Sequence, residues 1–485
     1  MDGPAKPTQS GRLSEPAQTS TTVTRYSYYA VGVLTGLNFL NYIDRQILPA
    51  VGPLMKQELH LTDTEIGAFD AALLLSFTIL APLFGRLGDR YSRTKLMAGA
   101  AVLWSIATGL TALADHSPIL PPAISFHLPF SGLLYALSGV ALALCLVRAL
   151  VGIGESSYST ITPTLIADYV PMKRRATALG VFQAAIPMGF ALGFVLGGFL
   201  GKYFGWRVAF MVVGLPGLIA SVFVWRLQEP ERGKQDRQVP QTDLPAAALA
   251  PAPTDQSWLR TSWGILRTRD WFLSTAGYTA LTFVLGAFST WASFMLVDDK
   301  QMTAEHAAYV LGATIFLAGA AGTFGGGWVA DRVAAKRKNG YFLVCAASSV
   351  LAIIPSVTVL VTHNPLLFIP AIFVAVMFLF TNNAPFHAIL VNSVPPSVRA
   401  SAMALNILVI HSFGDLISRQ GVGLLSDSVA AGKVRAIAAL ASALGIDPTR
   451  EHLTAALLVV PVALLVSALF FLWGARKNSN SSPQS

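Results

Sequence analysis

Apolar and polar segments alternate along the chain in a pattern typical of helices that cross a membrane. Twelve segments are apolar for about 20 residues, the length that an α-helix needs to span the roughly 30 Å hydrocarbon core of a bilayer. We therefore expect an all-α membrane protein with twelve spanning helices. The predicted spans are 28–52, 63–84, 95–114, 132–158, 176–201, 206–226, 272–297, 305–330, 341–362, 365–391, 400–426 and 453–475.

Composition and charge support this expectation and set the orientation. Hydrophobic residues make up 53% of the 485-residue chain and charged residues only 12%, too few to cover a water-soluble protein of this length. With the amino terminus in the cytoplasm, 24 of the 34 Lys and Arg residues fall in cytoplasmic segments, 7 on the opposite side and 3 inside spans. Because basic residues are retained on the cytoplasmic side, we expect both termini there. The net charge of +9 follows from this bias and needs no nucleic-acid partner.

Two sequence echoes show that the chain contains a duplicated half. Residues 85–90 (Gly-Arg-Leu-Gly-Asp-Arg) recur as residues 327–332 (Gly-Trp-Val-Ala-Asp-Arg), and Val-Pro at 170–171 with Arg-Ala-Thr-Ala at 175–178 recurs at 394–402. Internal repeats of helical halves are typical of secondary transporters. The sequence therefore predicts two pseudo-symmetric bundles of six helices.

Between the halves, residues 228–257 are rich in Pro, Ala, Gln and charge, as in a linker. The stretch that begins at Trp258 has the pattern of an amphipathic helix on the membrane surface. The expected domains are a disordered cytoplasmic tail 1–27, a first bundle 28–227, a cytoplasmic linker with an amphipathic helix 228–270, a second bundle 271–477 and a disordered tail 478–485.

The first span carries ionisable residues, each of which costs about 2.5 to 3.5 kcal/mol on insertion scales and so needs a partner, water or a function. Asn41, Asp44 and Arg45 lie close together in it. Neighbouring residues on a helix do not face each other. We therefore expect Asp44 to pair outside its own helix, although a self-neutralising Asp44–Arg45 pair stays an alternative.

The fourth span carries a second group of charges. Arg148 and Glu155 are seven residues apart and therefore face the same space, about 10.5 Å apart along the helix, while Gly152 leaves a notch for a head group or another helix. One interpretation is a structural network that joins spans one and four. In the other, Asp44 or Glu155 takes up a proton while Arg148 holds an anionic substrate group. The remaining substrate-site candidates are Asn41, Arg45 and Ser159.

The eleventh span carries His411, Asp415 and Arg419 at steps of four residues. This spacing predicts a ladder along one helix face, in which the carboxylate reaches both neighbours. We interpret it mainly as a structural polar ladder.

The repeated turns are candidates for a conformational latch on the cytoplasmic side. Their glycines allow helix ends to approach closely, and their charges can close one side when paired and open it when separated. The second copy has Ala334 and Ala335 opposite Ser92 and Arg93, so we expect a weaker latch there. The latch candidates are Gly85, Gly88, Asp89, Arg90, Arg93, Asp331 and Arg332.

These motifs carry a family resemblance. Residues 85–95 resemble the loop signature of the major facilitator superfamily, and Arg148 with Gly152 resembles its fourth-helix motif. Within the superfamily the chain is most similar to the Spinster family of lysolipid and sphingolipid transporters. The residues that carry the second resemblance are 41–45, 152–168 and 411–415.

The resemblance covers about residues 28–475 and implies a major facilitator fold that works by alternating access. It also implies that the positions of Asp44, Glu155 and Arg148 line the central cavity and couple transport to protons. We thus expect a monomeric, proton-coupled carrier of an amphiphilic lysolipid or sphingolipid-like substrate. Alternatives within the superfamily are an organic anion/proton symporter and a multidrug-type exporter.

Several function classes are disfavoured. Nucleotide-binding, metalloprotease and nucleophile-elbow motifs are absent from the sequence, so we expect no enzyme activity, no cofactor and no metal. A sensory receptor would need an output domain longer than the linker and tails. The expected partners are the substrate, protons and membrane lipids, and the Ala-rich composition favours a bacterial inner membrane.

Overall fold

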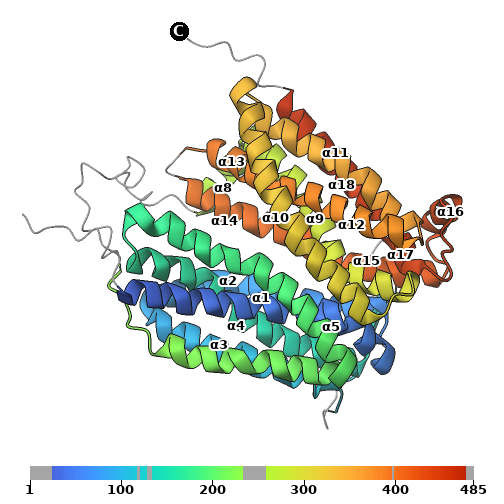
Figure 1. Cartoon of the computed structure of the whole chain (residues 1–485), viewed down its shortest axis with the longest axis horizontal. Coiled ribbons are helices and arrows are strands. Elements are labelled where there is room, and N and C mark those ends of the chain that lie inside the picture. Colours follow the sequence, from blue (N-terminus) through green and yellow to red (C-terminus); the bar gives the residue numbers. More distant parts are fainter. Residues whose placement is uncertain (1–24, 117–120, 128–133, 233–257, 396–397, 477–485) are drawn as a thin grey trace, which may run out of the picture.

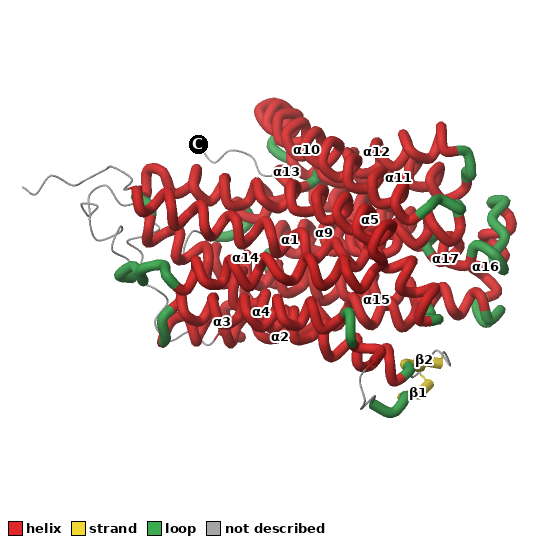
Figure 2. Tube along the Cα trace, turned by 60° about the horizontal axis from the view of Figure 1, so that its bottom comes forward, coloured by secondary structure: helices red, strands yellow, loops and turns green. Residues whose placement is uncertain are grey.

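The structure is a computed structural model of the 485-residue chain, and it describes residues 25–116, 121–127, 134–232, 258–395 and 398–476. Long helices run side by side along the molecule (Figures 1 and 2). We call the side on which Arg25 and Arg476 lie the terminal side, and the side of the turn between α1 and α2 the far side. The predicted tails 1–27 and 478–485 lie outside the described residues, except for 25–27.

The first bundle is built from long helices whose starts follow from local capping. Thr62 and Glu65 form a reciprocal capping box at the start of α2. The side chains of Ser92 and Ser138 accept hydrogen bonds from backbone amides in the first turns of α3 and α4. The helices are α1 (Arg25–Leu59), α2 (Asp63–Arg90), α3 (Arg93–Thr111), α4 (Gly139–Tyr169) and α5 (Met172–Trp225).

The element α5 contains both the fifth and the sixth predicted spans. Gly205 interrupts it with a positive φ of 83°, which a residue with a Cβ atom adopts only at a cost. The chain reverses there, so the two arms of α5 cross the bundle in opposite directions. The predicted boundary between the spans, at 201–206, is therefore correct.

The loop between α3 and α4 contains a small antiparallel hairpin, which departs from the all-α expectation. A 3-10 turn (Ala114–His116) leads to β1 (Ile124–His127) and β2 (Leu134–Leu137), paired in the register Ile124↔Leu137. The fourth span was predicted from residue 132, but it begins at Gly139 because the preceding apolar residues belong to β2. The hairpin lies beside the bundle on the far side (Figure 2).

The second bundle contains several spans built from more than one element. The tenth span is broken close to Pro385, since α12 ends at Thr381 and α13 begins at Asn383. The elements are α8 (Trp258–Arg267), α9 (Arg269–Phe294), the π-helix η3 (Met295–Asp299), α10 (Ala304–Lys336), α11 (Gly340–Val361), α12 (Pro365–Thr381), α13 (Asn383–Asn392), α14 (Arg399–Val409), the π-helix η5 (Ile410–Asp415), α15 (Leu416–Ala430), α16 (Arg435–Ala443), α17 (His452–Ala456) and α18 (Val459–Ala475).

Length and composition alone select nine helices of the described chain as membrane-spanning. Counting the two arms of α5 separately, and adding α1 and α3, gives the twelve predicted segments. The element α1 contains several polar residues among its apolar ones, including Asn38, Asn41, Asp44 and Arg45, which lower its mean hydropathy.

The predicted amphipathic helix is α8, while residues 233–257 of the linker lie outside the described part. Ser262 and Ile265 of α8 are buried, whereas Trp263 is exposed. The Arg267 guanidinium lies 5.2 Å from the centre of the Trp263 ring. The helix therefore has one face on the bundle and one aromatic face outside.

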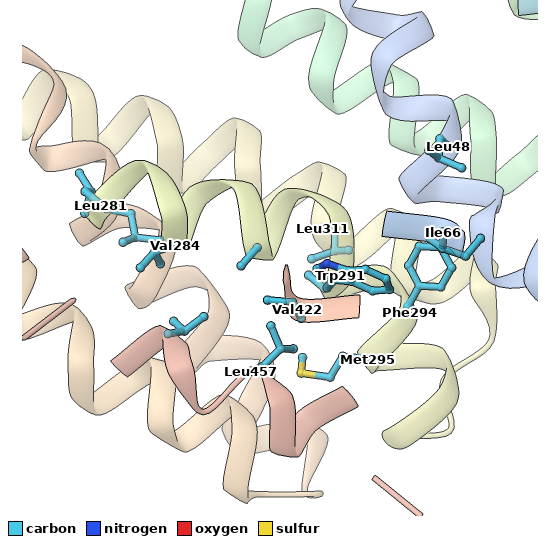
Figure 3. Packing of buried hydrophobic residues seen from close by; sticks show 14 of the residues in the cluster. Leu48, Ile66, Leu281, Val284, Trp291, Phe294, Met295, Leu311, Val422 and Leu457 are labelled. Carbon is cyan, nitrogen blue, oxygen red and sulfur yellow. The ribbon is translucent and has the colours of Figure 1, made fainter. Parts of the chain in front are cut away.

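The two bundles pack against each other from the far side. One apolar cluster runs through both of them and includes Leu48 and Ile66 of the first bundle and Trp291 and Phe294 of the second (Figure 3). The helices α5 and α10 come together near the far side and spread apart toward the terminal side (Figure 1). The far side is thus closed in this conformation.

Glycines allow the closest of these contacts. A Cβ atom added to Gly423 of α15 would lie 2.3 Å from the Asp63 carbonyl oxygen of α2, and one added to Gly67 of α2 would lie 2.7 Å from the Arg419 carbonyl oxygen. The backbones of α2 and α15 therefore touch, and their side chains are held in a fixed register.

Candidate functional site

The first pair of buried charges joins α1 and α4. Asp44 and Arg148 are both 1% exposed, and an Arg148 Nη1 lies 3.8 Å from Asp44 Oδ1. The Thr108 hydroxyl of α3 donates a hydrogen bond of 2.6 Å to the other carboxylate oxygen. The structure thus brings together two of the predicted site residues and confirms that Asp44 pairs outside its own helix.

The second pair, Arg45 with Glu155, also joins α1 and α4. An Arg45 Nη2 and its Nε both lie 2.7 Å from Glu155 Oε2, and the Glu155 side chain is fully buried while 23% of Arg45 remains exposed. The guanidinium of Arg45 also lies near the rings of Tyr42 and Phe77, at 5.4 and 5.1 Å. Neighbouring residues on α1 therefore point to different partners on α4, and the alternative of a self-neutralising Asp44–Arg45 pair is not what the structure shows.

The cluster has hydrogen-bonding capacity that its described neighbours do not fill. Asp44 Oδ1, Glu155 Oε1, Arg148 Nε and Nη1 and the Asn41 amide nitrogen are buried without a hydrogen-bond partner among the described residues. An unpaired buried polar group costs about 1–3 kcal/mol. The described contacts therefore leave both ion pairs incompletely satisfied.

The remaining candidates of the cluster have local roles here. The notch at Gly152 is filled by another helix, because an added Cβ would lie 2.2 Å from both the Leu73 carbonyl oxygen and the Ser76 hydroxyl of α2. The Ser159 hydroxyl donates to the Ser156 carbonyl at 3.3 Å. A direct substrate contact of Arg148, Asn41, Arg45 or Ser159 stays a prediction.

A cavity of about 480 Å³ lies mainly within the second bundle. Its walls are mostly apolar, from α9, α10, α12 and the α14–η5–α15 span, with Phe190 of α5 added from the first bundle. His411, Asp415 and Arg419 line the same cavity. A largely apolar pocket with a few polar groups at one place is typical of a ligand site.

The predicted polar ladder is present and extends further than expected. His411 Nδ1 lies 3.3 Å from an Asp415 carboxylate oxygen, and Arg419 Nε donates to the other at 2.8 Å. An Arg419 Nη1 also contacts Asp70 of α2, and the Thr290 hydroxyl of α9 donates to the same Asp70 oxygen at 2.5 Å. The ladder therefore links the cavity to the first bundle.

Sequence reasoning missed Asp70, although it is an acidic residue inside the predicted span 63–84. A charged residue at that depth in the membrane is costly, and this signal could have identified Asp70 as a candidate. Its partner Arg419 is 349 residues away, so no local spacing indicated the pair.

A second group of charges missed from the sequence closes the far side. Lys56 Nζ lies 2.6 Å from the Asp63 carboxylate and 2.7 Å from that of Asp298 in the other bundle. Asp427 of α15 accepts hydrogen bonds from the backbone amides of Asp63 and Thr64, at 3.1 and 2.7 Å. These contacts, which we call the far-side gate, connect helix ends of both bundles.

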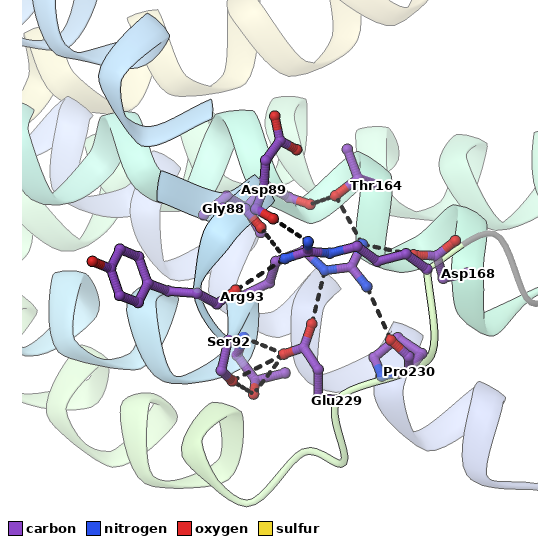
Figure 4. A network of polar contacts seen from close by, with 12 residues as sticks. Gly88, Asp89, Ser92, Arg93, Thr164, Asp168, Glu229 and Pro230 are labelled. Carbon is purple, nitrogen blue, oxygen red and sulfur yellow. Dashed lines mark hydrogen bonds and ion pairs between the residues drawn. The ribbon is translucent and has the colours of Figure 1, made fainter. Parts of the chain in front are cut away.

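The first predicted latch lies on the terminal side and is made inside the first bundle (Figure 4). Arg93 contacts Asp168 of α4 at 2.6 Å and Glu229, which follows α5, at 2.8 Å. Arg232 donates to the carbonyls of Gly88 and Asp89. The latch thus ties α2, α3, α4 and the end of α5 to one another.

The other latch residues vary in their surroundings. A Cβ atom at the buried Gly88 would lie 3.1 Å from Ile161, and one at Gly85 would meet Thr160 at 3.6 Å, so α2 and α4 approach closely here. The side chains of Asp89 and Arg90 are exposed.

Glu229 is the acidic centre of the latch. Its burial raises its pKa, but the hydrogen bonds from Arg93 and from the Thr94 backbone amide lower it more, so that the pKa of Glu229 lies below its ordinary value. At neutral pH the carboxylate is therefore charged and holds the start of α3.

The second copy of the turn makes fewer contacts of this kind. The Tyr341 hydroxyl donates to Asp331 at 3.2 Å, and the Arg332 guanidinium lies 3.3 Å from the centre of the Trp328 ring. Across the described ranges, no group of three or more His, Cys, Asp or Glu side chains is arranged to hold a metal ion.

Comparison with known proteins shows which family the chain belongs to. The family model of the Major Facilitator Superfamily matches residues 34–418. The chain is 31% identical over 424 residues to protein spinster homolog 1 of Homo sapiens, with 82% of this chain and 72% of that protein covered. It is 29% identical over 417 residues to protein spinster of Drosophila melanogaster, with 84% and 63% covered.

Solved structures agree on the fold. A bacterial homolog to the human lysosomal transporter Spinster, in an inward-facing and occupied conformation, matches with a TM-score of 0.75 at 19% identity, covering 95% of this chain and 100% of that one. A D-xylose-proton symporter matches with a TM-score of 0.67 at 17% identity, covering 92% and 97%. The chain is therefore a secondary transporter that belongs to the Spinster family of the major facilitator superfamily.

Proposed function

We propose that the chain is a proton-coupled carrier that moves an amphiphilic lysolipid or sphingolipid-like substrate across the membrane by alternating access. The observation that carries the coupling is the arrangement of Asp44 and Glu155, two buried carboxylates that each pair with an arginine of another helix. Burying a charge is costly unless a partner compensates it. Each carboxylate therefore needs its arginine while it is charged. Protonation neutralises the carboxylate and removes that need.

Protonation of Asp44 would remove the negative partner of Arg148 and leave a buried cation without compensation. An anionic substrate group is then the natural replacement, because a guanidinium binds phosphate or carboxylate through two parallel hydrogen bonds. The same exchange applies to Glu155 and Arg45. Proton and anion would thus enter together, and Asn41 and Ser159 would add polar groups to the substrate site.

The substrate class is supported by the cavity and by the relatives. Its apolar walls suit an acyl or sphingoid chain, and His411, Asp415 and Arg419 provide a polar end. Its volume of about 480 Å³ falls in the range of about 300–1,000 Å³ usual for small-molecule sites. Family members are named Spinster, and the human protein is called a lysosomal transporter.

We also propose that the terminal side is cytoplasmic, because most Lys and Arg residues fall on it. The closed far-side gate then makes this conformation inward-facing. The repeated turns would pair across the bundles in the opposite, outward-facing state. A monomer in a bacterial inner membrane fits this proposal.

Transport into liposomes with an imposed pH gradient tests the coupling. We expect wild-type protein to take up a labelled lysophospholipid faster with the gradient, and Asp44→Asn and Glu155→Gln to lose that acceleration while retaining exchange of substrate. Asp447→Asn, at an exposed loop carboxylate, is the matched control and should behave as wild type. Gradient-driven uptake by both site variants at the wild-type rate would overturn the assignment.

The substrate class has its own readout in the same liposomes. If short carboxylates inhibit the uptake of labelled lysophospholipid as strongly as unlabelled lysophospholipids do, the result would favour the organic anion symporter. Equal competition by unrelated lipophilic cations would select a multidrug-type exporter.

A further inference from the structure

Arg419 occupies a position that serves two parts of the molecule at once. It lines the cavity, and 18% of its side chain remains exposed. Its Nε is held by Asp415 of the same span at 2.8 Å, while its Nη1 contacts Asp70 in the other bundle. The guanidinium therefore faces the cavity and bridges the bundles with the same group.

Asp70 depends on this contact. It is buried, and besides Arg419 it accepts a hydrogen bond of 2.5 Å from Thr290 of the second bundle. Both described contacts of its carboxylate thus come from the opposite bundle. Removing one partner of such a buried ion pair is strongly destabilising, because it leaves a charge without compensation.

The ion pair lies where the two backbones touch. Gly67, three residues before Asp70, packs against the Arg419 carbonyl oxygen, and the Trp291 indole donates to the same oxygen at 3.0 Å. The backbone at this point is fixed, so the guanidinium can turn between Asp70 and the cavity while its helix stays in place.

Among the described residues, the cavity contains one cation, Arg419, whose guanidinium is held by two carboxylates, Asp415 and Asp70, and can take an anionic ligand in place of one of them. Most of its lining is apolar, and Arg419 lies at its polar end with His411 two turns of helix away. Arginine keeps its charge and presents a planar fork that fits phosphate or carboxylate.

We propose that Arg419 binds the anionic head group of the substrate, and that the head group displaces Asp70 from Arg419 and so weakens the contact that closes the far side. The inference rests on the proposed function only in that the substrate is an anionic amphiphile. Arg148 does not line this cavity, so Arg419 is a second, separate position for the head group, and its pair with Asp70 gives a route from ligand binding to gate opening. A ligand shifts a conformational equilibrium by its difference in affinity for the two states. Here the difference arises because the head group and Asp70 compete for Arg419 only while the far side is closed.

Equilibrium binding tests the proposal without any proton gradient. The protein is placed in phosphatidylcholine nanodiscs and titrated with two probes of equal chain length, lysophosphatidic acid and the neutral monoacylglycerol. Arg419→Gln should weaken binding of lysophosphatidic acid at least about tenfold, as expected for a lost hydrogen bond to a charged group, and leave monoacylglycerol unchanged. Asp70→Asn should tighten the binding of lysophosphatidic acid several-fold, because the side chain that competes for Arg419 has lost its charge.

Asp298→Asn is the matched control, since it removes an ion pair of the far-side gate that does not line the cavity. If a looser gate alone affects binding, this variant should change the affinities for both probes by the same factor. Should Arg419→Gln fail to fold, Asp70→Asn carries the test, because a purely structural contact predicts no gain in affinity for the anion.

Two results would overturn the inference: wild-type affinity for lysophosphatidic acid in folded Arg419→Gln, or equal effects of Asp70→Asn on both probes. If wild-type protein binds neither probe, the proposed substrate class fails together with the inference. If wild-type protein binds both probes and Arg419→Gln matches it, only the inference fails.

Discussion

Each buried charge on α1 is compensated by the opposite charge on α4, and this crossed pairing sets the energetics of single residues. Asp44 and Arg148 lose almost all contact with solvent, so each depends on the other for compensation. Arg45 keeps partial exposure, so its pair with Glu155 is better screened by solvent. The Asp44–Arg148 pair is therefore the more sensitive to loss of one partner.

A double-mutant cycle measures this dependence. Arg148→Met leaves the Asp44 carboxylate buried without its cation, and we expect a loss of stability of about 3–5 kcal/mol. Asp44→Asn combined with Arg148→Met removes both charges and should recover most of that loss. Unfolding in detergent with increasing denaturant provides the measurement, with Arg45→Met alone as the better-solvated comparison. A double variant as unstable as Arg148→Met would show that the pair contributes little.

The residues predicted from sequence differ in how far their surroundings could be foreseen. Asp44, Arg148 and Glu155 were identified because a charge inside an apolar span is costly wherever it points. Their pairing scheme could be foreseen only in part, since helix geometry disfavours the Asp44–Arg45 contact but does not choose a partner on another helix. The Asp70–Arg419 pair depends on how two bundles dock, which no helical period encodes.

Among the elements, the spanning helices were the most predictable part of the molecule. Their length is fixed by the bilayer, and their starts are fixed by caps such as Thr62 with Glu65. The hairpin β1–β2 was not predicted, because its short alternating strands merge with the apolar start of the fourth span. The π-helices η3 and η5 were missed as well, since hydrophobic periodicity does not separate them from an α-helix.

The latch is an element-scale device whose acidic centre lies outside the spans. Glu229 has a lowered pKa in the folded state, so it contributes stability above its ordinary pKa of 4.5 and loses that contribution as the pH falls through the lowered value. We expect the segment after α5 to remain attached to Arg93 at neutral pH and to detach in acid. Hydrogen exchange of residues 226–232, corrected for the intrinsic pH dependence of exchange, measures this.

Glu229→Gln is the control for the latch. The amide keeps the shape of the side chain but carries no charge, so the segment should exchange faster than wild type at neutral pH and show no further change in acid. An acid-induced detachment of equal size in Glu229→Gln would contradict the assignment of the effect to this carboxylate.

On the scale of the whole molecule, the structure is closed on the far side, where contacts between the two bundles must break before that side can open. The far-side gate joins α1, α2, η3 and α15, and the Asp70–Arg419 pair belongs to the same interface between the bundles. The latch on the terminal side holds only the first bundle together. In an alternating-access carrier the two sides open in turn by rocking of one bundle against the other, so the far-side gate must separate in each cycle.

Locking the far side should therefore stop transport and spare binding. Lys56 and Asp298 form an ion pair of 2.7 Å across the bundles, so cysteines at these two positions can be joined by a short bifunctional thiol reagent after Cys145 and Cys345 are replaced by Ser. We expect cross-linked protein to bind lysophospholipid from the terminal side with near wild-type affinity and to transport none. Cleavage of a reducible cross-link should restore transport, and single-cysteine variants treated with the same reagent should keep their activity. Transport that continues in fully cross-linked protein would mean that the substrate does not cross by separation of these helix ends.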